Sequence, residues 1–256
     1  MDLGLQGRSF IVTGASRGLG LAVAAELVNE GAKVLIASRS SEAVERAASG
    51  LGAAAVGVAC DLADPGAPAR LIEAAMGELG ALNGAFVSHG GPPAASASDL
   101  DDATLDLAVE GSLVAPIRFV RELTRVLKDG DSVVVLTSSS AVEPLAGLVT
   151  SNLTRPGVWA YMKTLADEVG PRGVRVNCVI PGSFATDRII DLLRRQAESS
   201  GRSLEELRVE ADRQVPLGRI GEPEELAKVA AFLLSPAASY VTGSAWRVDG
   251  GAVRGL

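Results

Sequence analysis

The most constraining feature of this sequence is a glycine-rich segment between an apolar run and a helical pattern. Ser9–Thr13 has the composition of a buried strand, Gly14–Gly20 reads Gly-Ala-Ser-Arg-Gly-Leu-Gly, and Leu21–Glu30 continues as a helix. Glycines in such a turn allow close backbone approach, and the helix N-terminus offers free N–H groups and partial positive charge to a pyrophosphate. The segment therefore predicts a dinucleotide-binding turn, with a merely structural turn as the alternative.

The rest of the chain alternates strand-like and helix-like segments. Continuous apolar strands such as Val133–Leu136 are typical of a parallel sheet that is covered on both faces. We expect one domain over residues 1–256, an α/β fold with a doubly wound parallel sheet and helices on both faces. The further strands are predicted at Lys33–Ala37, Ala55–Ala59, Gly84–Ser88, Ser132–Thr137, Arg175–Ile180 and Ala245–Val248, and helices at Ser41–Ser49 and Ala67–Leu79.

One polar, charge-rich stretch, Thr186–Gly221, departs from this alternation. It contains two helical patterns, Ile189–Ser199 and Leu204–Gln214. An insertion beyond the carboxyl end of a strand often forms a wall or lid over a substrate, so we expect a helical lid at residues 186–221. A solvated helical pair is the alternative.

Charge and cysteine usage exclude several classes of protein. Twenty-four Lys and Arg against 31 Asp and Glu give a net charge of −7, opposite to what binding of nucleic acid requires. Cys60 and Cys178 lie far apart in apolar surroundings and belong to no metal-ligand cluster. No apolar run reaches the roughly 18 residues of a membrane span. We expect a cytoplasmic protein with no nucleic-acid, membrane or metal partner.

Two arginines indicate the kind of dinucleotide. The strand at Lys33–Ala37 is followed by Ser38 and Arg39, with no acidic residue to hold the adenosine ribose hydroxyl. Arg39, together with Arg17 in the glycine turn, would pair with a 2′-phosphate, which favours NADP(H) over NAD(H); two solvent-facing arginines are the alternative. Asp61 either accepts a hydrogen bond from the adenine amino group or caps the following helix.

Several motifs in a fixed order carry a resemblance over essentially the whole length. They are Thr13–Gly20, Asp61-Leu62, Pro171–Asn177, Pro181-Gly182 with Thr186, Pro216–Arg219, Val241–Gly243 and Val248–Gly251. With these the sequence resembles the short-chain dehydrogenase/reductase family and is similar to its 3-oxoacyl-acyl-carrier-protein reductases. The resemblance implies a Rossmann fold, NADP(H), a small-molecule carbonyl or alcohol substrate, and a homo-tetramer or homo-dimer with subunit contacts near residues 248–256.

The resemblance also implies which residues contact the cofactor. The family's Pro-Gly segment and later Thr meet the nicotinamide end, and its landmark after the fourth strand, here altered to Ser88-His89-Gly90-Gly91, lies beside the ribose. The full expected set is Gly14, Ser16, Arg17, Gly18, Leu19, Gly20, Ser38, Arg39, Asp61, Leu62, Ser88, His89, Gly90, Pro181, Gly182 and Thr186.

The family's catalytic Asn, Ser, Tyr and Lys match Ser112, Ser138, Ser151 and Arg155, so that only the serine is retained. Reduction of a carbonyl requires a proton donor, and a serine hydroxyl lacks the acidity of a phenol beside a cation. Arg155 stays protonated, so it keeps a role in binding and loses that of a proton shuttle. Two hypotheses follow: a reductase with an atypical catalytic set, and a catalytically weak or inactive NADP(H)-binding sensor or assembly subunit.

Other residues are candidates for the missing proton donor. His89, the only histidine, is a catalytic, cofactor-contacting or structural residue, and Glu143 could orient a water. Tyr161 lies about 15 Å along a helix from Ser151, too far to replace it. Pro156 has no N–H and is best tolerated in a first helical turn, so we expect the helix to start later or to be kinked there.

Overall fold

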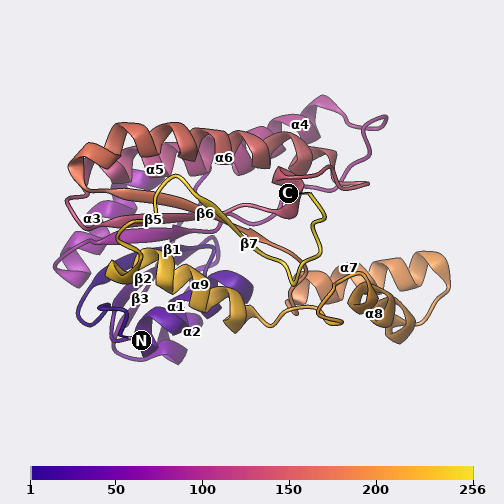
Figure 1. Cartoon of the computed structure of the whole chain (residues 1–256), viewed down its shortest axis with the longest axis horizontal. Coiled ribbons are helices and arrows are strands. Elements are labelled where there is room, and N and C mark those ends of the chain that lie inside the picture. The colour runs from indigo at the N-terminus through magenta and orange to yellow at the C-terminus, as the bar shows by residue number, and fades with distance from the viewer. Residues whose placement is uncertain (1, 256) are drawn as a thin grey trace.

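The apolar runs form a parallel sheet, because each is flanked on both faces by helices that remove it from water. The computed structural model describes residues 2–255, apart from the side chains at 188, 195, 196 and 199, and its strands lie in the order β3-β2-β1-β4-β5-β6-β7 (Figure 1). All strand predictions are confirmed to within one residue at each end: β1 Ser9–Thr13, β2 Lys33–Ser38, β3 Ala55–Ala59, β4 Gly84–Val87, β5 Ser132–Leu136, β6 Arg175–Pro181 and β7 Ala245–Val248.

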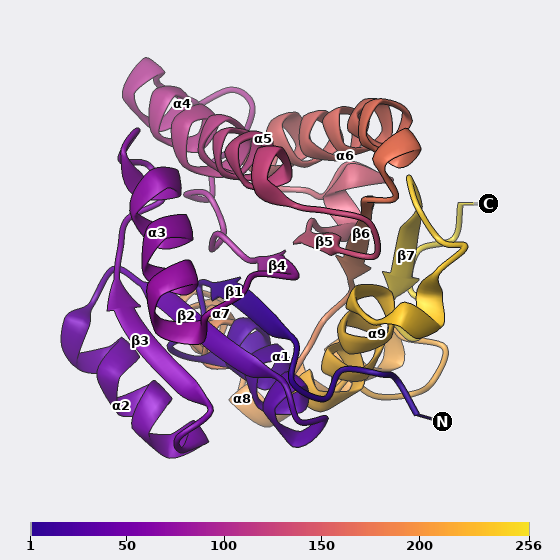
Figure 2. The ribbon, with the colours of Figure 1, turned by 90° about the vertical axis from the view of Figure 1, so that its left-hand side faces the viewer.

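Helices cover the sheet on both sides, as Figure 2 shows. Neighbouring residues of one strand enter opposite cores: Ile11 packs with α3, α5 and α6, whereas Phe10 and Val12 pack with α1, α2 and α9. This explains the absence of polar alternation in the strands. The helices are α1 Gly18–Asn29, α2 Ser41–Leu51, α3 Ala67–Leu79, α4 Asp102–Val109, α5 Ala115–Val126, α6 Val149–Val169, α7 Asp187–Ser200, α8 Leu204–Arg213 and α9 Pro223–Leu234. None of those in residues 2–255 is both long and apolar enough for a bilayer.

Strands β1 to β3 follow one another towards one edge of the sheet, and β4 to β7 follow one another towards the other edge. The order of the strands therefore switches between β1 and β4, which pair in parallel at the centre. Their carboxyl ends are joined by side chain and backbone: the Thr13 hydroxyl donates to the Ser88 carbonyl at 2.8 Å and accepts from the Ser88 N–H at 3.1 Å. Ligands of doubly wound sheets bind at such a switch point, outside the carboxyl ends of the strands.

Helix α6 corrects one expectation. It begins at Val149 and continues past Pro156 to Val169, so the prediction of a later start is wrong. Tertiary hydrogen bonds hold its first turn: the Val149 N–H donates to the Ala95 carbonyl, and the Thr150 hydroxyl donates to the Pro93 carbonyl. These bonds offset the loss of the one that a proline cannot donate. Arg155 consequently lies within α6, one residue before the proline.

The segment predicted as a lid forms α7 and α8, which project from the rest of the molecule (Figure 1). Its two ends lie together, because the Ala185 N–H donates to the Gly221 carbonyl at 2.8 Å and the Gly221 N–H donates to the Ser183 carbonyl at 3.0 Å. The insertion therefore leaves and rejoins the domain at one place, beside the carboxyl end of β6.

Candidate functional site

The glycine turn after β1 is packed so tightly that side chains are excluded. A Cβ atom at Gly14 would lie 2.6 Å from the Ser88 carbonyl oxygen, and one at Gly20 would lie 2.4 Å from the Gly14 carbonyl oxygen. Gly14 and Gly18 also have φ values of 60° and 59°, which L side chains rarely adopt. The Ala15 N–H donates to the Ala37 carbonyl of β2 at 3.1 Å. Because these positions carry no side chain, a dinucleotide can approach the backbone of the turn closely.

The first turn of α1 suits an anion. Arg17 precedes the helix, no side chain caps its N–H groups, and the first turn contains no acidic residue. The unpaired N–H groups and the positive end of the helix dipole would thus face a pyrophosphate without competition. Ser16 and Leu19 lie in this same turn. The residues present therefore fit a dinucleotide.

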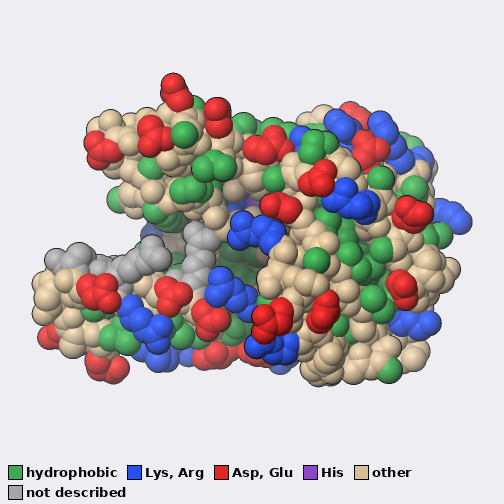
Figure 3. Space-filling model, turned by 180° about the vertical axis from the view of Figure 1, so that it is seen from behind, with side chains coloured by type: hydrophobic (Ala, Val, Ile, Leu, Met, Phe, Trp, Pro, Cys, Tyr) green, Lys and Arg blue, Asp and Glu red, His purple; other side chains and the backbone are tan. Residues whose placement is uncertain are grey.

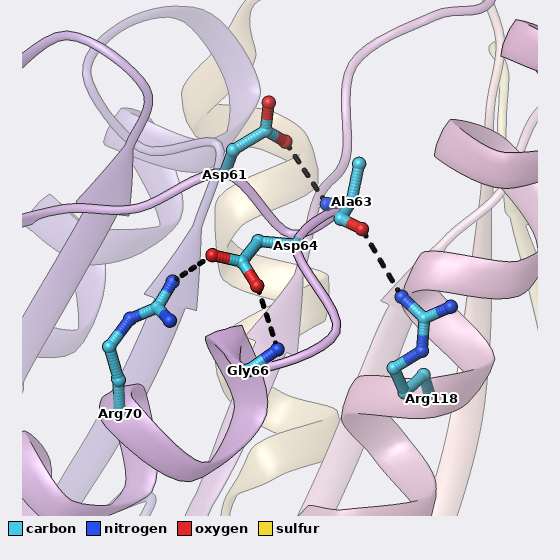
Figure 4. A network of polar contacts seen from close by, with 6 residues as sticks. All are labelled: Asp61, Ala63, Asp64, Gly66, Arg70 and Arg118. Atoms are coloured by element: carbon cyan, nitrogen blue, oxygen red, sulfur yellow. Dashed lines mark hydrogen bonds and ion pairs between the residues drawn. The ribbon is translucent and has the colours of Figure 1, made fainter.

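The loop after β3 is fixed by its own hydrogen bonds (Figure 4). An Asp61 carboxylate oxygen accepts from the Ala63 N–H at 3.0 Å, and the Arg118 guanidinium of α5 donates to the Ala63 carbonyl at 3.3 Å. The alternative of Asp61 as a helix cap is wrong, because Gly66 is the residue before α3. Asp61 is exposed at the same edge of the sheet as Ser38 and Arg39.

Asp64 stabilises the remainder of this loop. Its carboxylate accepts from the Gly66 N–H at 2.8 Å and from Arg70 at 2.7 Å, and these contacts hold its pKa below the usual range, the N–H having the larger effect (Figure 4). Leu62 packs against the core on the α3 side of the sheet. The geometry leaves Asp61 presented to solvent from a preformed loop.

The predicted nicotinamide contacts lie at the other end of the glycine turn. A Cβ atom at Gly18 would lie 3.6 Å from the Thr186 methyl group, so the turn and the start of the lid are neighbours. Arg17 and Asp187 lie 3.9 Å apart, both largely exposed. Gly182, after Pro181, donates its N–H to the Val248 carbonyl at 2.9 Å. The structure thus brings together residues that are about 170 positions apart in sequence.

Three serines follow β5, and the structure separates their roles. The Ser138 hydroxyl accepts from the Ser140 N–H at 3.2 Å, whereas the Ser140 and Ser151 hydroxyls lie 2.8 Å apart and are buried. The sequence pointed to Ser138 and Ser151 as catalytic candidates and did not distinguish Ser140. The sequence signal for Ser140 is its place in a run of three serines, 138–140. Such a run does not indicate which of the three hydroxyls contacts α6.

Arg155 joins the ends of two strands. It is 5% exposed, and its guanidinium contacts Nε2 of His89, donates to the Gly90 carbonyl at 2.6 Å and reaches the Leu136 carbonyl at 3.4 Å. Burial and then the charge of Arg155 hold the pKa of His89 well below its usual value. His89 is therefore neutral at physiological pH beside a permanent cation.

The remaining candidates are placed as follows. Ser112 is buried in a π-helical turn, Glu110–Val114, between α4 and α5, and its backbone acts to raise the pKa of His89, against the larger effects of burial and Arg155. Glu143 is half-buried after the three serines. Tyr161 packs against the core farther along α6, where burial raises its pKa. In residues 2–255 no group of three or more His, Cys, Asp and Glu could hold a metal ion.

A deep hollow lies between the lobe that carries α7 and α8 and the lobe that carries α4, and Lys and Arg side chains gather at its inner end (Figure 3). The elements around it are the strand ends and loops just described. This arrangement combines an anion-binding turn, a hydroxyl pair and a buried cation at one edge of the sheet. It is suited to holding a dinucleotide with a second small molecule beside it.

Comparisons with known proteins agree with this geometry. The family described as enoyl-(acyl carrier protein) reductase matches residues 14–253. L-rhamnose 1-dehydrogenase (NAD(P)(+)) of Azotobacter vinelandii is 33% identical over 258 residues, 95% of this chain and 96% of that protein. Human dehydrogenase/reductase SDR family member 4 is 31% identical over 252 residues, 94% and 86% of the two chains. The structure of L-sorbose reductase from Gluconobacter frateurii with NADPH and L-sorbose superposes with a TM-score of 0.94 at 30% identity, over 100% of both chains.

Proposed function

Because this chain belongs to the short-chain dehydrogenase/reductase family, we propose that it is an NADP(H)-dependent oxidoreductase that interconverts a carbonyl and an alcohol in a small molecule. One observation carries the proposal: the glycine turn, the hydroxyl pair of Ser140 and Ser151, and Arg155 meet at one edge of one sheet, at its switch point. The residues that would hold the cofactor and the hydroxyls that would donate hydrogen bonds to a carbonyl oxygen thus lie at the same edge of the sheet.

The arginines supply the preference for NADP(H). Arg39 follows β2 and is exposed, and Arg17 is exposed in the glycine turn. Both guanidiniums are exposed to an anion, since the ion pair of Arg17 with Asp187 is long and exposed. A 2′-phosphate offers them charge-assisted, bidentate hydrogen bonds, which a ribose hydroxyl does not.

The catalytic set of this chain is Ser112, Ser138, Ser151 and Arg155, an atypical set for the family. When bound, the nicotinamide supplies or accepts a hydride. Ser138 and Ser151 donate hydrogen bonds to the carbonyl oxygen, and the fixed charge of Arg155 favours negative charge that develops there. The proton comes from water in the hollow, because neither serine nor arginine is an acid at neutral pH. Loss of a general acid costs about 10²–10⁴ in rate, so we expect slow turnover.

The substrate class follows from the relatives and the open hollow. Two relatives are named for action on sugars, L-rhamnose and L-sorbose, and a third, from Rhodococcus, is named cyclohexanol dehydrogenase. We propose a small carbonyl or alcohol of this size, with 3-oxoacyl thioesters as the other class to be tested. Residues 186–221 form the substrate lid, because both ends of the insertion meet at Phe184 and Gly221, beside the nicotinamide contacts.

One observation favours a second candidate function, that of a cofactor-binding sensor or assembly subunit without turnover. The Ser151 hydroxyl is buried against Ser140, and Arg155 is buried against His89 and backbone carbonyls. Both side chains at the substituted positions are thus engaged within the protein. The glycine turn that binds the cofactor needs neither of them.

The test combines cofactor binding with turnover in the same samples. NADPH fluorescence is titrated first, and NADPH oxidation is then followed with L-sorbose, cyclohexanone and 3-oxoacyl thioesters. Turnover that falls in Ser151→Ala supports the enzyme with this catalytic set. Binding without turnover, together with turnover gained in the double variant Ser151→Tyr/Arg155→Lys, supports the sensor.

The family resemblance extends to the assembly. We propose a homo-tetramer or homo-dimer in which the edge strand β7 and the residues after it contribute to the contact. Trp246 of β7 is 37% exposed and Tyr240 is fully exposed near it in sequence, so this edge carries apolar surface. Light scattering that finds a monomer would contradict this.

A further inference from the structure

His89 lies where three elements meet. It follows β4, it contacts Arg155 of α6, and the backbone of Ser112, in the π-helical turn before α5, acts to raise its pKa. The ring thus contacts one of the positions that the family resemblance marks as catalytic, Arg155, and is influenced by the backbone of a second, Ser112.

The contact with Arg155 determines the tautomer of the ring. A guanidinium only donates hydrogen bonds, so Nε2 of His89 accepts, and the ring proton is on Nδ1. Nδ1 is buried and makes no hydrogen bond of normal geometry within the described residues, whereas the Ser112 backbone acts on the ring in the direction that raises its pKa. That direction is the one expected of a carbonyl that accepts from Nδ1–H.

The sequence explains why the Ser112 carbonyl is open to such an interaction. In an α-helix its partner would be the N–H of the residue four positions later, and that residue is Pro116, which has none. The chain forms a π-helical turn there instead. The Ser112 carbonyl therefore lacks its α-helical donor, and a carbonyl oxygen has two lone pairs with which it can accept from a further group.

We propose that His89 is a positioning residue, whose neutral ring accepts from Arg155 and holds the guanidinium against the ends of β4 and β5. This inference rests on the proposed function, in which Arg155 provides the fixed charge beside the cofactor. Two further acceptors, the carbonyls of Gly90 and Leu136, also belong to the seat of the guanidinium. Unlike these backbone carbonyls, the ring of His89 is an acceptor that a substitution can remove.

Three substitutions at His89 separate positioning from packing. His89→Gln places an amide oxygen near the position of Nε2 and keeps an acceptor for Arg155. His89→Asn is shorter and keeps a polar group only near the position of Nδ1, and His89→Leu removes both. We expect NADPH affinity within about threefold of wild type for the glutamine variant and a loss of about tenfold for the other two. Rescue by glutamine alone is the readout that a packing role would not give.

A double-mutant cycle with Arg155→Met tests whether His89 acts through Arg155. In that background His89→Leu should have no further effect on NADPH affinity, because the group that it positions is already absent. NADPH affinity unchanged in His89→Leu, or reduced equally with and without Arg155, would overturn the inference. If His89→Leu does not fold, the NADPH affinities of His89→Gln and His89→Asn still test the inference, and equal affinities of these two variants would overturn it.

The same cycle is measured by urea unfolding of the protein without cofactor. This reading does not depend on the proposed function: if wild type binds no NADPH, that function fails, while coupling between positions 89 and 155 in unfolding still supports the seat of Arg155. Independent effects of the two substitutions on unfolding would overturn the inference by themselves.

Discussion

At the scale of single residues, Arg39 carries the proposed preference for NADP(H). It follows β2, whose carboxyl end lies beside the glycine turn through the bond from Ala15 to Ala37. We predict that Arg39→Ala weakens NADPH binding about 10- to 100-fold, since a hydrogen bond to a charged group contributes roughly 1.5–3 kcal/mol, and that it leaves NADH affinity within about threefold. Fluorescence titration with both cofactors measures this.

Arg46→Ala is the matched control for Arg39. It also removes an exposed arginine on the α2 side of the sheet, but its guanidinium pairs with Glu42 one helical turn away. We expect no change in the ratio of NADPH to NADH affinity for this variant. An equal loss of both cofactors in Arg39→Ala would mean that Arg39 does not read the 2′-phosphate.

His89 gives a prediction about pH. Its pKa in the native state is held well below the ordinary 6.5, first by burial and then by Arg155, the only charged group found to act on it. As pH falls from 7.5 towards 5, the unfolded chain binds a proton at His89 and the native state does not, so wild type loses free energy of unfolding. The slope contributed is at most about 1.4 kcal/mol per pH unit.

The comparison is with His89→Gln, which has no titrating group. Urea unfolding at several pH values should show that wild type loses more stability than the variant as pH falls through 6.5, and that the two curves run parallel above pH 7.5. Carboxylates titrate equally in both proteins and cancel in the difference. Parallel curves down to pH 5 would show that His89 is not a buried neutral histidine.

At the scale of elements, Arg175 joins a strand to the end of a helix. From β6 its guanidinium donates to the carbonyls of Leu233 and Ser235 at 2.8 Å each, which closes the last turn of α9. Burial, and then the charge of Arg8, lowers its pKa to about 10, so it remains a cation at neutral pH. We predict that Arg175→Ala destabilises the fold by about 3–5 kcal/mol, because buried carbonyls lose their donors.

Thermal and urea unfolding measure this, and Arg172→Ala is the control. Arg172 precedes the same strand, is exposed, and donates to a single carbonyl, that of Thr124. We expect it to cost less than about 1 kcal/mol. If the two variants are equally stable, the carbonyls at the end of α9 do not depend on Arg175.

Elements that are specified by their own residues could be predicted from the sequence. The seven strands were predicted, because apolar runs of this length between glycine-containing turns fit a buried parallel sheet and little else. The start of α6 was not predictable, since bonds to Ala95 and Pro93, about 55 residues away, hold its first turn against Pro156. The π-helical turn at Glu110–Val114 was missed, although Pro116, which cannot donate to the carbonyl of Ser112, was a local signal for a departure from the α-helix.

The candidate site was likewise predictable only in part. The glycine turn, the strand ends and the serines after β5 could be placed together, because the carboxyl ends of parallel strands share one edge of the sheet. Which side chains meet there could not: Ser140 rather than Ser138 contacts Ser151, and His89 contacts Arg155. Such pairs depend on the rotation of α6 against the sheet, which packing of the whole core determines.

At the scale of the whole molecule, the proposed lid makes few contacts with the sheet. The segment after α8 packs on the domain, since the Leu217 N–H donates to the Gly250 carbonyl at 3.3 Å, whereas α7 and α8 pack mainly on each other. Apolar side chains of the lid remain exposed, among them Leu192 at 52%. A surface of this kind, bordering a hollow, is suited to closing over a bound molecule.

Removal of α7 and α8 tests this division. We predict that replacing residues 187–213 with a flexible glycine and serine linker leaves folding and NADPH affinity within about threefold of wild type, because the glycine turn and the bridge between Phe184 and Gly221 remain. Turnover should fall at least about 100-fold, since positioning of the second substrate and exclusion of water are lost. Retained turnover would show that α7 and α8 are a solvated helical pair. Lost NADPH binding would show instead that the lid belongs to the cofactor site, with Thr186 and Asp187 supporting the glycine turn.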